Sequence, residues 1–197
     1  MRTDYRKQLE ALIALPDTKS RRLLLHACCG PCSCHVLEYL SGHFEIGILF
    51  YNPNIQPQEE YFKRLLSMRR LIEAAPYKIT LTENGWNGRE FDIAAAGLED
   101  REEGGKRCEA CFLLRLEKTA RAAKERGFEY FCTTMTVSPR KNADIINETG
   151  SKLAEHYGVK WLPSDFKKNN GFKRTVELSE KYGLYRQDYC GCLYSRR

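Results

Sequence analysis

Apolar runs and amphipathic segments alternate along this chain. Short apolar runs with the composition of buried strands cover residues 23–27, 44–51, 77–81, 128–132 and 159–162. Apolar residues at helical spacing predict helices over residues 4–15, 31–41, 57–75, 86–97, 108–126, 138–157 and 172–183. Because strands alternate with helices, the pattern predicts an α/β fold with a doubly wound, mostly parallel sheet.

Polar and thiol side chains follow the ends of the predicted strands. Cys28 and Cys29 come directly after the first strand, residues 51–54 follow the second, and residues 133–142 follow the fourth. Doubly wound sheets bind their ligands outside the carboxyl ends of the strands. We therefore expect the functional site at this edge of the sheet.

The length and composition predict a single globular domain over residues 1–197. Of these residues, 42% are hydrophobic and 29% are charged. No apolar run approaches the roughly 18 residues of a membrane span, and the charged N-terminus lacks the apolar core of a secretory signal. We expect a cytoplasmic monomer without a membrane partner. The net charge of +6 fits either a solvated surface or a polyanionic partner such as RNA.

Cysteine is the residue type that points to chemistry. There are nine cysteines, and an odd number excludes a complete disulfide framework. In a reducing compartment, clustered cysteines indicate metal or redox chemistry. The tight pairs are Cys28 with Cys29, Cys108 with Cys111, and Cys190 with Cys192. Cys32 is a seventh candidate ligand, whereas Cys34 and Cys132 are expected to be small buried apolar residues.

Three kinds of site fit these thiols. Cys29 and Cys32 flank Gly-Pro between a strand and a helix, as in the redox pair of thioredoxins, but that chemistry needs two thiols alone. Two Cys pairs can form a structural zinc site. A cubane iron–sulfur cluster takes four thiolates, so six paired thiols fit one cluster plus a second metal.

The spacing within the pairs refines the iron hypothesis. Cys108 and Cys111 lie one helical turn apart, so both can reach one cluster. The N-terminus of their helix favours the thiolate form. Side chains of adjacent residues are expected to diverge, so Cys28 and Cys29 are expected to serve two neighbouring metal centres.

Five segments carry distinctive residues, in the order LHACCGPC at 25–32, FYNPNIQP at 50–57, KRCEAC at 106–111, TTMTVSPRKN at 133–142 and YRQDYCGC at 185–192. Together they resemble the QueH type of epoxyqueuosine reductase. The resemblance implies an enzyme that reduces the epoxide of epoxyqueuosine, in the wobble position of a tRNA anticodon, to the alkene of queuosine. It implies a Rossmann-like fold similar to the adenine nucleotide alpha-hydrolase type.

The resemblance also implies two iron centres. One is a [4Fe-4S] cluster on four cysteines, and the other is a mononuclear iron on two cysteines, a further protein ligand and a cluster sulfide. The six paired cysteines then become metal ligands, and Cys32, where some members have Asp, supplies the extra iron ligand. The cluster candidates are Cys29, Cys108, Cys111 and Cys190. The full candidate metal set is Cys28, Cys29, Cys32, Cys108, Cys111, Cys190 and Cys192.

Removal of an epoxide oxygen takes two electrons and two protons, so the enzyme needs a reductant, which the sequence does not identify. A cluster passes electrons one at a time, and an iron with an open position can polarise the epoxide oxygen. Besides Cys28 and Cys32, the candidate catalytic residues are the proton donors Tyr51 and Tyr189. His26 lies on a buried strand and is expected to be a core histidine.

The tRNA partner requires phosphate and base contacts. Candidate phosphate contacts are Arg140, Lys141, Lys167, Lys168, Lys173 and Arg174. Asn52 and Asn54 either hydrogen-bond the modified base or cap the turn before Pro57. The Ser-Gly-Gly-x-Asp-Ser signature of ATP-cleaving relatives is absent, so no ATP use is expected. The alternative hypothesis is a zinc-stabilised RNA-binding module without redox turnover.

Overall fold

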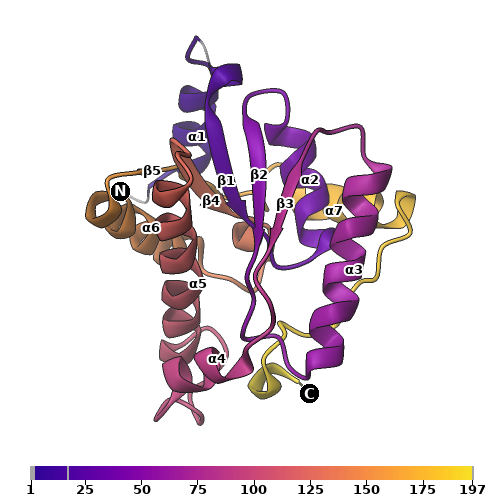
Figure 1. Ribbon diagram of the computed structural model, residues 1–197, viewed down its shortest axis with the longest axis vertical. Coiled ribbons are helices and arrows are strands. Elements are labelled where there is room, and N and C mark those ends of the chain that lie inside the picture. Colours follow the sequence, from indigo (N-terminus) through magenta and orange to yellow (C-terminus); the bar gives the residue numbers. More distant parts are fainter. Residues whose placement is uncertain (1–2, 17, 197) are drawn as a thin grey trace.

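The computed structural model describes residues 3–16 and 18–196; of the predicted domain, residues 1–2, 17 and 197 lie outside the described residues. The described residues form a five-stranded, all-parallel sheet in the order β3-β2-β1-β4-β5 (Figure 1). The strands are β1 (Arg22–His26), β2 (Glu45–Phe50), β3 (Thr80–Glu83), β4 (Tyr130–Thr133) and β5 (Lys160–Trp161). The predicted doubly wound α/β fold is confirmed.

Helices cover both faces of this sheet (Figure 1). They are α1 (Tyr5–Ile13), α2 (Gly30–Leu40), α3 (Gln58–Ala74), α4 (Gly88–Ala95), α5 (Lys106–Glu125), α6 (Ala143–Tyr157) and α7 (Gly171–Lys181). Contacts of α2 with α3 and α7 form one layer, and α5 packs with α6 on the other side. None of the described helices is both long and apolar enough to cross a membrane.

The central strand β1 shows why its sequence is apolar throughout. Leu23 and Leu25 pack into the core on the α2 and α3 side, whereas Leu24 packs into the core on the α5 and α6 side. All three are at most 1% exposed. Full burial of a leucine side chain stabilises a fold by roughly 1.5–3 kcal/mol. A strand with helices on both faces therefore needs apolar residues at consecutive positions.

The sheet topology creates the crevice in which a ligand can bind. β1 pairs with β2 on one side and with β4 on the other. The chain leaves the carboxyl end of β1 into α2, and it leaves β4 toward α6 on the opposite face. The two connections diverge at this point, which is where open parallel sheets bind ligands. Cys28 and the residues after Thr133 lie at this edge.

Most element boundaries differ from the predicted ones by one or two residues, and two starts differ by three or more. The predicted strand 77–81 is wrong in position: β3 begins at Thr80, where pairing with Gly47 of β2 starts. Tyr77 packs against the core before that pairing begins, which explains its apolar signal. The predicted helix start at residue 138 is also wrong, because α6 begins at Ala143 behind the Asn142 N-cap.

Candidate metal centre

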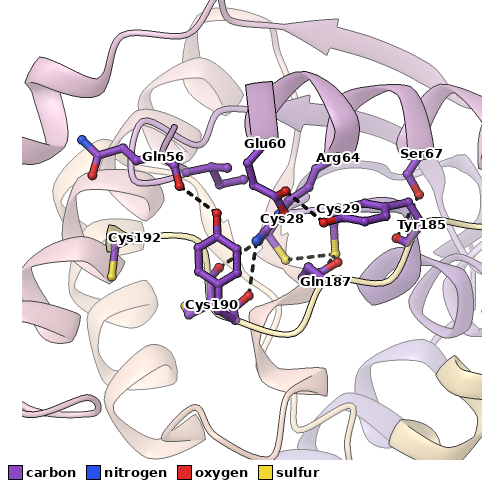
Figure 2. Close-up of polar contacts among 12 residues, drawn as sticks. Cys28, Cys29, Gln56, Glu60, Arg64, Ser67, Tyr185, Gln187, Cys190 and Cys192 are labelled. Atoms are coloured by element: carbon purple, nitrogen blue, oxygen red, sulfur yellow. Dashed lines mark hydrogen bonds and ion pairs between the residues drawn. The ribbon is translucent and has the colours of Figure 1, made fainter. Parts of the chain in front are cut away.

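Three cysteine sulfurs converge where β1 ends and α2 begins. The sulfurs of Cys28 and Cys29 lie 3.9 Å apart (Figure 2), and those of Cys28, Cys29 and Cys32 all lie within 4.8 Å of one another. The prediction that the adjacent side chains diverge is therefore wrong. Cys29 is the N-cap of α2, and its sulfur accepts a hydrogen bond of 3.4 Å from the backbone N–H of Cys32. Capping turns its side chain back over the first helical turn, toward the other two sulfurs.

Gly30 allows this cysteine turn to press against α3. A Cβ added at Gly30 would lie 2.5 Å from the carbonyl oxygen of Ser67, which is a backbone atom of α3. The Ser33 hydroxyl donates to the carbonyl of Cys29 at 2.8 Å. These contacts fix the backbone of the turn, so the sulfurs are positioned before any metal binds.

The pKa values of the three thiols are shifted in different directions. Hydrogen bonds from the Cys29 and Cys32 thiols hold the pKa of Cys28 well below its usual range. Burial raises the pKa of Cys29 to about 12. The hydrogen bond to Cys28 keeps the proton on Cys32, whose pKa is raised as well. A cation that displaces these protons meets three sulfurs already in place.

Four more thiols gather beside the first turns of α5. Cys111 packs against Cys192 and the buried face of α4. Burial raises the pKa of Cys111 to about 12, and the charges of Cys190, Cys192 and Cys108 act in the same direction. Burial also raises the pKa of Cys108, whose sulfur accepts a hydrogen bond of 3.2 Å from the N–H of Gly104. These four thiols therefore interact electrostatically as one group.

The C-terminal tail is fastened to α3 and brings Cys190 to the site (Figure 2). The guanidinium of Arg64, buried in α3, donates to the carbonyls of Cys190 at 2.9 Å and Tyr189 at 3.2 Å. Glu60 holds that guanidinium at 2.7 Å. The Tyr189 hydroxyl donates to the carbonyl of Gln56 at 2.7 Å. The tail thus depends on side chains more than 120 residues earlier in the sequence.

An open cavity of about 210 Å³ lies beside the thiols, and its lining includes Cys28, Cys32, Cys190, Arg64, Arg140, Lys141, Arg186, Gln187 and Tyr189. Burial opposes the charge of Lys141, but the charges of Cys190, Cys28 and Cys32 raise its pKa. Gln187 donates from Nε2 to the sulfur of Cys29 at 3.0 Å, while its buried Oε1 has no hydrogen-bond partner. Glu103 and Asp188 also line the cavity, so four basic side chains against two acidic ones leave it net basic, and thiols form part of its wall.

The predicted proton donors occupy different places. Tyr189 lines the cavity, but the lining, within the described residues, does not include Tyr51. The Tyr51 hydroxyl donates to Glu90 instead. His26 is fully buried, with Nδ1 at 2.9 Å from the Thr133 hydroxyl and Nε2 at 3.0 Å from the carbonyl of Tyr51. Both ring nitrogens of His26 are satisfied, as expected of a core histidine.

The residues predicted to contact tRNA also lie in different places, some at the cavity and some away from it. Arg140 and Lys141 line the cavity. Lys167 forms an ion pair with Asp165 at 2.6 Å, and Lys168 lines a separate hollow.

Asn52 and Asn54 lie beneath the surface, each 1% exposed. The Asn52 amide donates to the carbonyl of Ala27 at 2.8 Å, so it ties the end of β2 to the end of β1. The side-chain oxygens of both asparagines are buried without a partner.

Three residues to which the sequence analysis gave no role complete the site: Arg64, Arg115 and Gln187, the last within the distinctive segment 185–192. Arg115 follows Cys108 and Cys111 on one stripe of α5, so helical spacing could have identified it. No periodic pattern marks Gln187, because it lies in an irregular tail.

The residues present fit a thiolate-bound metal. All nine thiols are free, and seven of them belong to the two groups described above. Cys34 and Cys132 are buried as predicted and donate to the carbonyls of Gly30 and Leu162. The Nη2 of Arg115 is buried without a partner, as expected if an anionic group completes the site.

Comparison with known proteins agrees with this arrangement. The model of the family epoxyqueuosine reductase QueH matches residues 23–197. An epoxyqueuosine reductase QueH of Streptococcus pyogenes serotype M1 is 40% identical over 98% of this chain and 78% of its own length. That of Staphylococcus epidermidis is 41% identical over 98% and 84%, and that of Thermotoga maritima is 38% identical over 88% and 89%.

A solved structure supports the fold. The U34-tRNA thiolase NcsA from Methanococcus maripaludis, with its [4Fe-4S] cluster, superposes with a TM-score of 0.53 at 12% identity. The match covers 98% of this chain and 66% of that one. At this identity, the likeness concerns the fold. The family match over nearly the whole chain is decisive: this chain belongs to the epoxyqueuosine reductase QueH family.

Proposed function

We propose that this protein reduces epoxyqueuosine in tRNA to queuosine. The epoxide takes up two electrons and two protons, both C–O bonds of the oxirane break, and the products are an alkene and water. The observation that carries the proposal is the convergence of Cys28, Cys29 and Cys32 within 4.8 Å beside a basic cavity. A cavity of this kind suits a redox group and an anionic substrate together.

We further propose that two iron centres occupy the thiols, a [4Fe-4S] cluster and a mononuclear iron. The ligands would be Cys28, Cys29, Cys32, Cys108, Cys111, Cys190 and Cys192. When bound, such centres supply single electrons and a Lewis-acidic position for the epoxide oxygen. The sulfurs of Cys28 and Cys29 lie 3.9 Å apart, so the two residues would hold metals that lie close together.

The protein supplies the environment for this chemistry. Tyr189 lines the cavity together with Cys28, Cys32 and Cys190, and we propose it as the proton donor. Its hydroxyl would have to leave the carbonyl of Gln56 to reach a substrate. Tyr51 is proposed as a second proton donor, but it lies outside the cavity lining, and its hydroxyl would have to leave the carboxylate of Glu90 to reach a substrate. Gln187 donates a hydrogen bond to the sulfur of Cys29, and its amide oxygen has no hydrogen-bond partner.

The tRNA is proposed to approach over the basic rim of the cavity. Arg140 and Lys141 are placed to meet the phosphates beside the wobble nucleotide. Lys167 and Lys168 are proposed to meet phosphates farther along the tRNA, because they lie outside the cavity lining. The buried Asn52 and Asn54 would act through the backbone that they position, unless tRNA binding exposes them.

The free thiols fit a protein that works in a reducing compartment, and we propose the cytoplasm. We also propose that it acts as a monomer and takes its electrons from a separate reductant.

Anaerobic reconstitution tests the proposed function. The full chain, loaded with iron and sulfide, should hold about five irons, four in a cubane and one beside it. With a chemical reductant, it should convert epoxyqueuosine-containing tRNA to queuosine-containing tRNA, as measured by mass spectrometry of the digested nucleosides. A colourless, zinc-containing protein that binds RNA without turnover would contradict the proposal. The family membership already disfavours that alternative.

A further inference from the structure

Helix α5 carries a buried arginine behind two of the candidate metal ligands. Cys108, Cys111 and Arg115 follow one another at intervals of three and four residues, so they share one stripe of the helix. Arg115 is 1% exposed, and its Nε donates to the carbonyl of Cys111 at 3.1 Å. Its side chain is therefore inside the protein and turns back along the helix toward Cys111.

Two other arginines of the described chain are buried, and both donate to carbonyls outside their own helices. Arg64 has the carboxylate of Glu60 at 2.7 Å and two carbonyl acceptors. Arg107 donates to carbonyls of the preceding loop and faces the ring of Tyr194 at 4.7 Å. The Nε of Arg107 is itself buried without a partner. These two side chains show the partners that a buried guanidinium ordinarily finds in this protein.

Arg115 instead reaches a carbonyl of its own helix, that of Cys111, and lies 5.9 Å from the ring of Phe112. No carboxylate among the described residues forms an ion pair or hydrogen bond with it, and its Nη2 is buried without any hydrogen-bond partner. A buried positive charge without a counter-charge strongly destabilises a fold. The buried, unpartnered Nη2 of Arg115 is therefore placed to receive an anionic group.

The thiols are the source of that negative charge. The strongest attractions on the Arg115 charge come, in order, from Cys111, Cys190, Cys28 and Cys108. These residues belong to both groups of candidate ligands. Thiols become thiolates when they bind metal, and an iron–sulfur centre on four thiolates carries a net negative charge.

We propose that Arg115 is the buried counter-charge of the iron–sulfur centre and raises its reduction potential. This inference rests on the proposed function. Reduction adds an electron to an already anionic centre, so a fixed positive charge nearby favours the reduced state. Arg115 is thus a positioning residue for electron transfer: it acts on the centre through the ligands and does not touch the epoxide.

A redox titration of the anaerobically reconstituted full chain tests this inference, with the reduced centre followed by electron paramagnetic resonance. Arg115→Gln should lower the equilibrium constant for reduction about tenfold, which is about 59 mV for a one-electron couple. Arg121→Gln is the matched control, because Arg121 lies exposed on the same helix and pairs with Glu125. Its potential should stay close to that of the wild type, and so should that of Arg115→Lys, which keeps the charge.

Equal potentials for Arg115→Gln and Arg121→Gln would overturn the inference while leaving the proposed function intact. A wild-type chain that assembles no iron–sulfur centre would instead refute the proposed function. If Arg115→Gln itself fails to assemble the centre, Arg115→Lys decides: restored assembly supports the counter-charge, and failure of both variants overturns it.

Thermal unfolding gives a second readout that does not depend on activity. Arg115→Met removes the unpaired charge, so the metal-free variant should melt at a higher temperature than the metal-free wild type. Reconstitution should then raise the melting temperature less in the variant than in the wild type. A metal-free variant that melts earlier, or does not fold, would make Arg115 an ordinary structural residue and overturn the proposal.

Discussion

At the scale of single residues, Cys29 joins a backbone role to a ligand role. It caps α2, its sulfur lies 3.9 Å from that of Cys28, and Gln187 donates to the same sulfur at 3.0 Å. Cys34, one turn farther along α2, is equally buried but donates to the helix carbonyl of Gly30. The sulfur of Cys29 thus faces other side chains of the site, whereas that of Cys34 faces the backbone of its own helix.

Replacement of each cysteine by alanine separates these roles. Cys29→Ala should lose iron on anaerobic reconstitution and lose epoxide reduction, because it removes a thiolate from the convergent group. Cys34→Ala should keep both, with the modest loss of stability expected from a small core cavity, about 1 kcal/mol. Iron content and absorbance of the reconstituted proteins measure the difference. A Cys29→Ala protein with full iron and full activity would contradict the ligand assignment.

At the scale of elements, the site depends on how closely α2 approaches α3. Gly30, at the start of α2, faces the backbone of Ser67 in the middle of α3. The same helix α3 holds the C-terminal tail through Arg64. A shift between α2 and α3 therefore moves the cysteine turn relative to Cys190.

Gly30→Ala should disturb both stability and metal binding. The added Cβ would meet a backbone carbonyl at 2.5 Å, and such overpacking costs about 1–3 kcal/mol. For a domain of this size, each 1 kcal/mol lowers the melting temperature by about 2–4 °C. Gly42→Ala is the control, because a Cβ there would meet nothing within 4 Å. Thermal unfolding of the metal-free chain should separate the variants, and equal melting temperatures would contradict the packing argument.

At the scale of the whole molecule, parallel strands bring remote segments to one edge. The turn after β1, the first turns of α5 and the C-terminal tail meet there, although they are separated by about 80 residues each. The same edge carries the basic side chains of the cavity, and Arg140 also lines a second hollow beside it. This edge is therefore the face that we expect to bind tRNA.

Arg140→Ala should weaken tRNA binding and its dependence on salt. Loss of one phosphate contact should reduce the slope of log Kd against log salt concentration by about one. Lys78→Ala removes an equal charge just before β3, at the amino ends of the strands and away from the cavity. This variant should leave the slope unchanged. Filter binding or fluorescence anisotropy at several salt concentrations measures both. Equal slopes for the two variants would place the tRNA elsewhere.

The fold class and the seven candidate thiols could be predicted from the sequence, because both follow from local patterns. The alternation of apolar runs with helical stripes predicts a parallel sheet, and short motifs such as residues 25–32 place thiols at strand ends. It misplaced β3, because core packing makes Tyr77 look like a strand residue without pairing.

The tertiary structure alone decided which groups face one another. The closeness of the sulfurs of Cys28 and Cys29 follows from helix capping geometry, which composition does not reveal. Gln187 reaches the sulfur of Cys29 because distant segments pack at one edge, and the same packing brings Cys28 and Cys190 near the charge of Arg115. A local pattern encodes the conformation of its own segment, whereas the charge and hydrogen bonds around a metal centre come from contacts between residues far apart in the chain.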